Sequence, residues 1–174
     1  MSRVIVVYRS KSGYTKRYAD MIAQAVGADI ADGRRVRIEA LKQYDTVVFG
    51  GGLYAVGING AAFIKRCMRE LKDQRIIVYA LGASPPRQEI VDEVRNNNFD
   101  AEQQTRMQFF LLRGGFDYDK LTPVGKLLMR LMKARLKRRD DPTADERGML
   151  AAYDTPVDFV KEKHIAPVVA AIEG

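Results

Sequence analysis

The sequence predicts an α/β fold, a doubly wound and mostly parallel sheet of five strands with helices on both faces. Short apolar runs rich in β-branched residues recur along the chain, and their continuous apolarity is typical of strands buried on both faces. Stretches with apolar residues at helical spacing lie between most of these runs. Because 174 residues suffice for one substantial core, we expect residues 1–174 to form a single domain.

The predicted elements alternate along the chain. Apolar runs predict strands at residues 3–8, 28–31, 46–50, 75–80 and 108–112. Helical spacing predicts helices at residues 14–26, 61–71, 88–97, 123–139 and 157–172. Gly27 is a stop signal for the first helix, and Pro167 disturbs the last. Residues 138–147 are charged and contain Pro142, so we interpret them as a surface loop.

The positive charge of the chain is local. The formal net charge is +7, and residues 126–139 alone hold an excess of that size because they contain no acid. The basic residues of this segment are Lys126, Arg130, Lys133, Arg135, Lys137, Arg138 and Arg139. We expect a small-molecule partner for this protein and no nucleic acid.

Cysteine usage and hydropathy indicate the compartment. The chain has one cysteine, Cys67, which excludes an internal disulfide and fits a reducing cytoplasm. No stretch approaches the ~18 apolar residues of a membrane span. We expect a cytoplasmic protein, and we interpret Cys67 as a core residue because it lies on the apolar face of its predicted helix.

The segment between the first predicted strand and the first predicted helix offers the groups that bind a phosphate. It combines three hydroxyls, N–H groups opened by a glycine, and the positive end of the following helix dipole. The candidate residues are Ser10, Lys11, Ser12, Gly13, Tyr14 and Thr15. Helix capping explains one hydroxyl, but three hydroxyls beside a glycine favour a phosphate site. Neither G-x-G-x-x-G nor G-x-x-x-x-G-K-[ST] follows the first strand, so a dinucleotide fingerprint and a P-loop are not predicted.

The run from Ser10 to Thr15 resembles the [ST]-x-[ST]-G-x-T loop of flavodoxins, which wraps the phosphate of FMN. The segment from Tyr44 to Tyr54, followed by Gly57, is similar to the flavodoxin segment that carries the first isoalloxazine loop. The resemblance implies a flavodoxin-like fold, FMN as the cofactor, and two ring loops at the carboxyl ends of the strands. The residues that it implies for these two loops are Gly51, Gly52, Leu53, Tyr54, Leu81, Gly82, Ala83 and Ser84.

The latter half of the chain, from Phe109 to Gly115 and into a basic helix, is similar to the menaquinone-dependent protoporphyrinogen oxidase family. This resemblance implies an FMN-dependent oxidoreductase that passes electrons from a reduced substrate, such as a porphyrinogen, through FMN to a quinone. An electron carrier and an FMN-free binding module stay open as alternatives. The chain departs from shuttle flavodoxins in having no tryptophan and a basic rather than an acidic charge. The sequence identifies no catalytic residue.

The basic helix at residues 123–139 is predicted to be amphipathic. One face holds Val124, Leu127, Leu128, Leu131 and Met132, and the opposite face holds Lys126, Arg130, Lys133 and Lys137. This pattern is typical of an interfacial helix, and also of a surface helix that packs its apolar face on its own core. Peripheral contact with the inner face of the membrane is therefore one of two interpretations.

Three further groups of residues attract attention without a predicted chemical role. His164, the only histidine, lies away from the candidate loops, and we expect a surface or capping residue. The acidic residues near position 140 have no metal-ligand spacing, so no metal site is predicted. Phe116 and Tyr118 follow the fifth strand and could either approach the flavin edge or pack within the protein.

Overall fold

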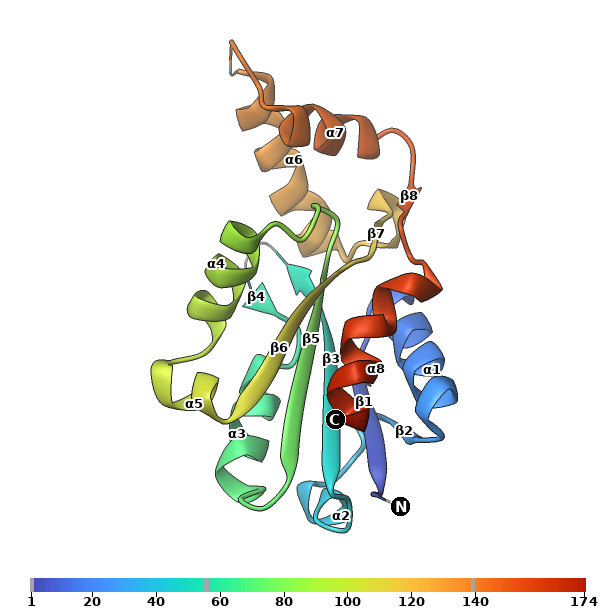
Figure 1. Cartoon of the computed structure of the whole chain (residues 1–174). Coiled ribbons are helices and arrows are strands. Elements are labelled where there is room, and N and C mark those ends of the chain that lie inside the picture. The colour runs from blue at the N-terminus through green and yellow to red at the C-terminus, as the bar shows by residue number, and fades with distance from the viewer. Residues whose placement is uncertain (1, 55–56, 139) are drawn as a thin grey trace.

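A computed structural model describes residues 2–54, 57–138 and 140–174. Its centre is a sheet of five parallel strands in the order β2-β1-β3-β5-β6 (Figure 1). The strands are β1 (Val4–Arg9), β2 (Asp29–Asp32), β3 (Thr46–Tyr54), β5 (Arg75–Gly82) and β6 (Met107–Arg113). A short strand, β4 (Gly57–Ile58), pairs antiparallel with the end of β3. The predicted doubly wound, five-stranded parallel sheet is confirmed.

Helices cover both faces of this sheet (Figure 1). One face packs against α1 (Tyr14–Val26) and α8 (Ala166–Glu173). The other packs against α2 (Ile38–Leu41), α3 (Ala61–Glu70) and α4 (Gln88–Asn98), and α5 (Ala101–Thr105) leads into β6. Successive side chains of a strand point to opposite faces, so Ile5 and Val7 enter the core below α3 whereas Val6 enters the core below α1. The continuous apolarity of the strands follows from this double burial.

The glycine run after Phe49 belongs to a strand and not to a loop. The strand predicted at residues 46–50 continues to Tyr54, because Gly50, Gly51 and Gly52 pair in register with β5, and the first two of them also with β1. The side chain of Tyr79 requires the first of these glycines, since a Cβ at Gly50 would lie 2.1 Å from its Cζ. The strand predicted at residues 75–80 likewise extends to Gly82.

A segment after β6 projects beyond the carboxyl edge of the sheet (Figure 1). Its base is an antiparallel pair, β7 (Gly115–Phe116) with β8 (Val157–Asp158). Between these strands lie a 3₁₀ turn, η1 (Tyr118–Lys120), and two helices, α6 (Pro123–Lys137) and α7 (Ala144–Ala152). The basic helix is thus confirmed to Lys137, and Arg139 lies outside the described residues.

Two predictions about this half of the chain are wrong. The supposed loop at residues 138–147 contains the start of α7, where Thr143 and Glu146 form a capping box. The supposed helix at residues 157–172 is a strand, a 3₁₀ turn (η2, Glu162–Ile165) and then α8. Pro167 lies in the first turn of α8. Backbone N–H groups in the first turn make no hydrogen bond within the helix, so proline is tolerated there and the helix begins at its neighbour Ala166.

Candidate functional site

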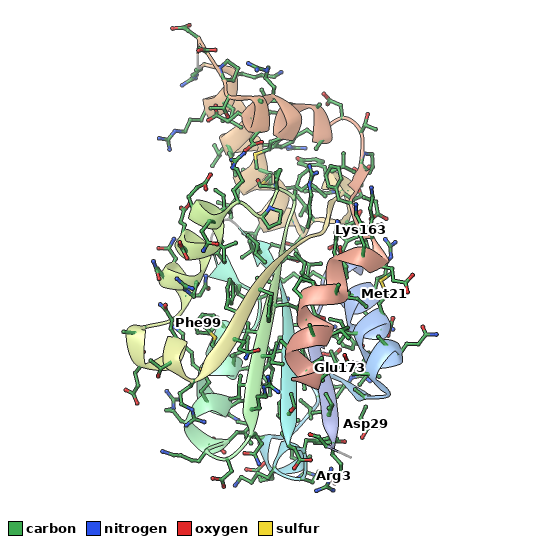
Figure 2. The ribbon with its side chains drawn as sticks, viewed as in Figure 1. Arg3, Met21, Asp29, Phe99, Lys163 and Glu173 are labelled. Carbon is green, nitrogen blue, oxygen red and sulfur yellow. The ribbon has the colours of Figure 1, made fainter. Side chains whose placement is uncertain are left out.

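The candidate site lies where the strand order reverses. The chain passes from β1 outward to β2 and then returns to β3 on the other side of β1. In such sheets the crevice outside the carboxyl ends of the two diverging strands is the usual ligand site. Arg9 and Gly51 are paired at this point, so the loop that follows β1 starts next to the last residues of β3. Figure 2 shows Arg3 and Asp29 at the opposite, amino edge of the sheet.

The phosphate-loop residues surround the amino end of α1. Gly13 is the N-cap residue and adopts a left-handed conformation with φ of 92°. No side chain caps the helix there, and its first turn contains no acid, so the positive end of the helix dipole stays uncompensated. The hydroxyl of Ser10 accepts a hydrogen bond from the Gly13 N–H at 3.0 Å, which curls the loop, while Ser12 is half-buried. This geometry is that of an anion-binding loop.

Two tyrosines connect the start of α1 to neighbouring elements. The buried Tyr79 hydroxyl donates to the carbonyl oxygen of Thr15 at 3.2 Å, and burial raises the pKa of Tyr79. The Tyr14 ring packs so closely against Gly115 that a Cβ there would lie 2.4 Å from the Tyr14 Cζ. Thr15 itself is buried. The loop is therefore positioned by the sheet and by β7, and not by its own sequence alone.

The end of β3 joins the phosphate loop. A Cβ placed at Gly52 would lie 3.4 Å from Oγ1 of Thr15 and 3.8 Å from Cε2 of Tyr54. The ammonium group of Lys11 lies 4.2 Å from the centroid of the Tyr54 ring, a cation–π contact. Burial raises the pKa of Tyr54, so its phenol stays protonated at neutral pH. Two of the three predicted parts of the site are thus adjacent.

The third part, residues 81–84, lies beside the first ring loop, because Leu81 pairs with Gly52. A Cβ at Gly82 would lie 3.1 Å from Cδ1 of Leu53. Leu81 and Gly82 are the last residues of β5, and the Leu81 side chain is buried in the core beneath α1. It can offer a ligand only its backbone, unlike Ala83 and Ser84, which are half-buried beyond the strand.

Sequence reasoning missed Arg113 and Lys120 beside this site. The Arg113 guanidinium stacks on Phe159 at 3.5 Å and its Nε donates to the Ala83 carbonyl at 3.1 Å. The ammonium group of Lys120 lies 5.6 Å from the Tyr14 ring centroid. Neither has a local motif, because Arg113 reaches the site from the last position of β6 and Lys120 reaches it from the segment after that strand. An arginine directly after the predicted strand at residues 108–112 was the one available signal.

The residues for which the sequence predicted no chemical role make structural contacts within the protein. Phe116 and Tyr118 each pack against Tyr153 at 5.7 Å between ring centroids, which favours the packing interpretation. Cys67 is fully buried, and burial raises the pKa of its thiol to about 12, as expected of a core residue. His164 is not a plain surface residue, since its Nδ1 lies 2.8 Å from the hydroxyl of the buried Tyr18.

The fold and the loop together define a doubly wound α/β protein with an uncapped helix end at its switch point. A family model described as a flavodoxin domain matches residues 5–143, and the chain therefore belongs to the flavodoxin domain family. Family membership identifies FMN as the cofactor, and the arrangement fits it, because the uncapped helix end offers free N–H groups and Tyr54, in contact with Lys11, offers a flat ring.

Several solved structures are similar to this chain at low sequence identity. A flavodoxin from Megasphaera elsdenii is 13% identical over 63% of this chain and 84% of its own, with a TM-score of 0.48. A WrbA-like flavodoxin from Agrobacterium tumefaciens is 18% identical over 78% of this chain and 94% of its own, with a TM-score of 0.49. A flavoprotein in complex with FMN from Lactobacillus acidophilus is 16% identical over 65% and 93%, with a TM-score of 0.42. No curated protein matches the sequence.

Proposed function

We propose that this protein is an FMN-dependent oxidoreductase of the protoporphyrinogen oxidase type, which passes electrons from a reduced substrate to a quinone. The observation that carries the proposal is that only one of the two ring loops has an aromatic side chain. The Tyr54 ring contacts Lys11, and Gly52 lies between Tyr54 and Thr15, whereas residues 81–84 of the opposite loop contain no aromatic side chain. A flavin ring on Tyr54 would keep its other face open to a planar substrate.

The residues divide the binding task. The hydroxyls of Ser10, Ser12 and Thr15, together with the N–H groups at the start of α1, would hold the phosphate. The conformation of Gly13 turns the chain so that these groups converge. The other cofactor-binding residues that we propose are Lys11, Tyr14, Gly51, Gly52, Leu53, Tyr54, Leu81, Gly82, Ala83 and Ser84, with Leu81 acting through its backbone.

The chemistry belongs to the cofactor, and the protein supplies orientation and charge. Bound FMN supplies two-electron oxidation and reduction. Each turnover would remove two electrons and two protons from the donor and deliver them to a quinone, which leaves as the quinol. Lys11 and Lys120, near the rings of Tyr54 and Tyr14, favour a donor that carries carboxylates, as porphyrinogens do. A shuttle flavodoxin, by contrast, docks through acidic residues on basic partners.

Fluorescence titration of FMN tests the binding site. Thr15→Val keeps the size of the side chain but removes its hydroxyl, and we expect affinity for FMN to fall about tenfold or more because a charge-assisted hydrogen bond is lost. Thr15→Ser, which keeps the hydroxyl, is the matched control and should bind within a few-fold of the unchanged protein. If the folded protein leaves FMN fluorescence unchanged, the proposed site is wrong.

Rapid mixing tests the reaction. Anaerobic protoporphyrinogen should bleach the absorbance of the FMN-loaded protein, and a menaquinone analogue should restore it. Ready exchange of electrons with a flavodoxin reductase, without bleaching by porphyrinogen, would instead identify an electron carrier.

A further inference from the structure

The helix α6 exposes its apolar face to solvent. Among the residues that the structure describes, five large hydrophobic side chains are exposed, and four of them belong to this helix. Their exposed fractions are 68% for Val124, 58% for Leu127, 60% for Leu128 and 62% for Leu131. These positions follow the i, i+3, i+4, i+7 pattern and therefore form one stripe. A surface helix that packs on its own core would bury this stripe, so that interpretation of the amphipathic pattern does not hold here.

The opposite face of α6 contacts the protein, although it carries several cations. The hydroxyl of Tyr153 donates to the Met129 carbonyl at 2.8 Å, and Leu136 is buried. The ammonium group of Lys133 lies 3.1 Å from an Asp154 carboxylate oxygen and 5.0 Å from the Tyr153 ring centroid. These contacts fix the rotation of the helix, so the outward position of the stripe follows from its packing.

Two arginines continue the stripe toward the end of the helix. At about 100° per residue, Arg135 and Arg138 fall on the same face as Leu128 and Leu131. Both are exposed, and within the described ranges neither guanidinium has a hydrogen bond or ion pair. The sequence contains no acid from 120 to 139. The outward face is thus apolar along its first half and cationic along its second.

We infer that this face of α6 docks on an anionic lipid surface. Its apolar side chains would enter the acyl boundary while Arg135 and Arg138 contact lipid phosphates, which is the arrangement of an interfacial helix. A second copy of the chain fits less well, because two such helices would bring their cations together with no acid to pair them. In the described residues no helix is long and apolar enough to cross a membrane, so contact would be peripheral. The projecting α6–α7 segment would then turn the carboxyl edge of the sheet toward the bilayer (Figure 1).

Vesicle sedimentation tests the inference without any redox step, so its result is independent of whether FMN binds. The protein should sediment with vesicles of phosphatidylcholine mixed with phosphatidylglycerol, less so at high salt, and weakly with phosphatidylcholine alone. Leu127→Gln/Leu131→Gln should lower partitioning at least tenfold. Arg135→Gln/Arg138→Gln should lower it about tenfold or more, since each cation near an anionic surface contributes about fivefold.

A matched pair on another element controls for net charge. Arg69→Gln/Lys72→Gln removes the same charge from exposed positions in the last turn of α3 and just beyond it, and it should leave partitioning within about twofold of the unchanged protein. Equal loss in both charge variants would reduce the effect to overall charge and overturn a docking face on α6.

Insertion itself can be followed because the chain has no tryptophan. Leu128→Trp should give blue-shifted emission with anionic vesicles and quenching by brominated lipid, whereas Ile30→Trp, at the exposed position on β2, should give neither. Sedimentation velocity decides between lipid and a second copy. A stable dimer that Leu127→Gln/Leu131→Gln dissociates, with no vesicle binding by either protein, would overturn the inference.

Discussion

Gly13 and Gly27 occupy the two ends of α1 with positive φ and open space around the position of a Cβ. Because only the backbone conformation opposes a side chain there, Gly13→Ala and Gly27→Ala should each lower the free energy of unfolding by about 1–2 kcal/mol. Only Gly13→Ala should also weaken FMN binding, about tenfold, since it disturbs the N–H groups that face the phosphate. Urea unfolding and FMN titration of both variants measure this, and equal FMN affinities would contradict the proposed loop.

Single residues show where prediction from sequence succeeds and fails. The left-handed conformation of Gly13 could be predicted, because the glycine lies between a recognisable buried strand and the helix that follows it. The continuation of β3 through Gly51 and Gly52 could not, because it depends on pairing with Ala80 and Leu81 of β5, which lie 29 positions later in the chain. Glycine next to glycine favours a turn locally, and the cross-strand contact overrides that preference.

The elements α1, β6 and η2 meet at one buried hydroxyl. Oη of Tyr18 lies 2.8 Å from the carbonyl oxygen of Arg113 and 2.8 Å from Nδ1 of His164, and it accepts the N–H of Lys161 at 3.3 Å. Burial, together with the nearby cations of Lys163, Lys161 and Arg113, lowers the pKa of His164 below its ordinary value of 6.5. The folded protein therefore favours the neutral imidazole.

This junction predicts a pH dependence of stability. A histidine whose pKa is lower in the folded state contributes stability that is complete above its unfolded pKa and is lost as pH falls through the folded pKa. The free energy of unfolding should therefore decrease between about pH 7.5 and 5.5, a window above the pKa range of ordinary carboxylates. His164→Asn keeps a polar group there without a titrating proton and should flatten the curve. The single histidine resonance in an NMR titration gives its pKa directly, and a value above 6.5 would contradict this account.

Elements with strong local patterns could be predicted, and elements defined by distant pairing could not. The helix α1 matches its prediction at both ends, because apolar spacing and Gly27 mark it locally. The strands β7 and β8 are two residues each, and about forty residues of the chain separate them. Two residues are too few to show a strand pattern in the sequence, so these strands could not be predicted. For α6, spacing predicted the stripe correctly but could not tell which face contacts the protein, since Tyr118 and Tyr153 decide it.

The whole molecule consists of a well-packed sheet and a thinly packed projection. Helix α1 buries six residues, whereas α6 buries only Leu136 and α7 only Ala152. The ion pairs of Arg87 with Asp145 and of Arg17 with Asp158 connect the projection to the sheet and its helices, but all four side chains are substantially exposed. Exposed ion pairs contribute little, typically about 0–1 kcal/mol. The projection is therefore expected to open locally without unfolding the sheet.

Hydrogen exchange measures this difference directly. Regions with few buried apolar contacts open with free energies far below that of global unfolding, so amides of α6 and α7 should exchange faster than those of β1, β3 and β5. Anionic vesicles should slow exchange in α6 selectively, because docking of its outward face leaves the sheet unchanged. Neutral vesicles and the Leu127→Gln/Leu131→Gln variant serve as controls and should show no slowing. Protection of α6 equal to that of β3 in solution would mean that the projection folds as one cooperative unit with the sheet.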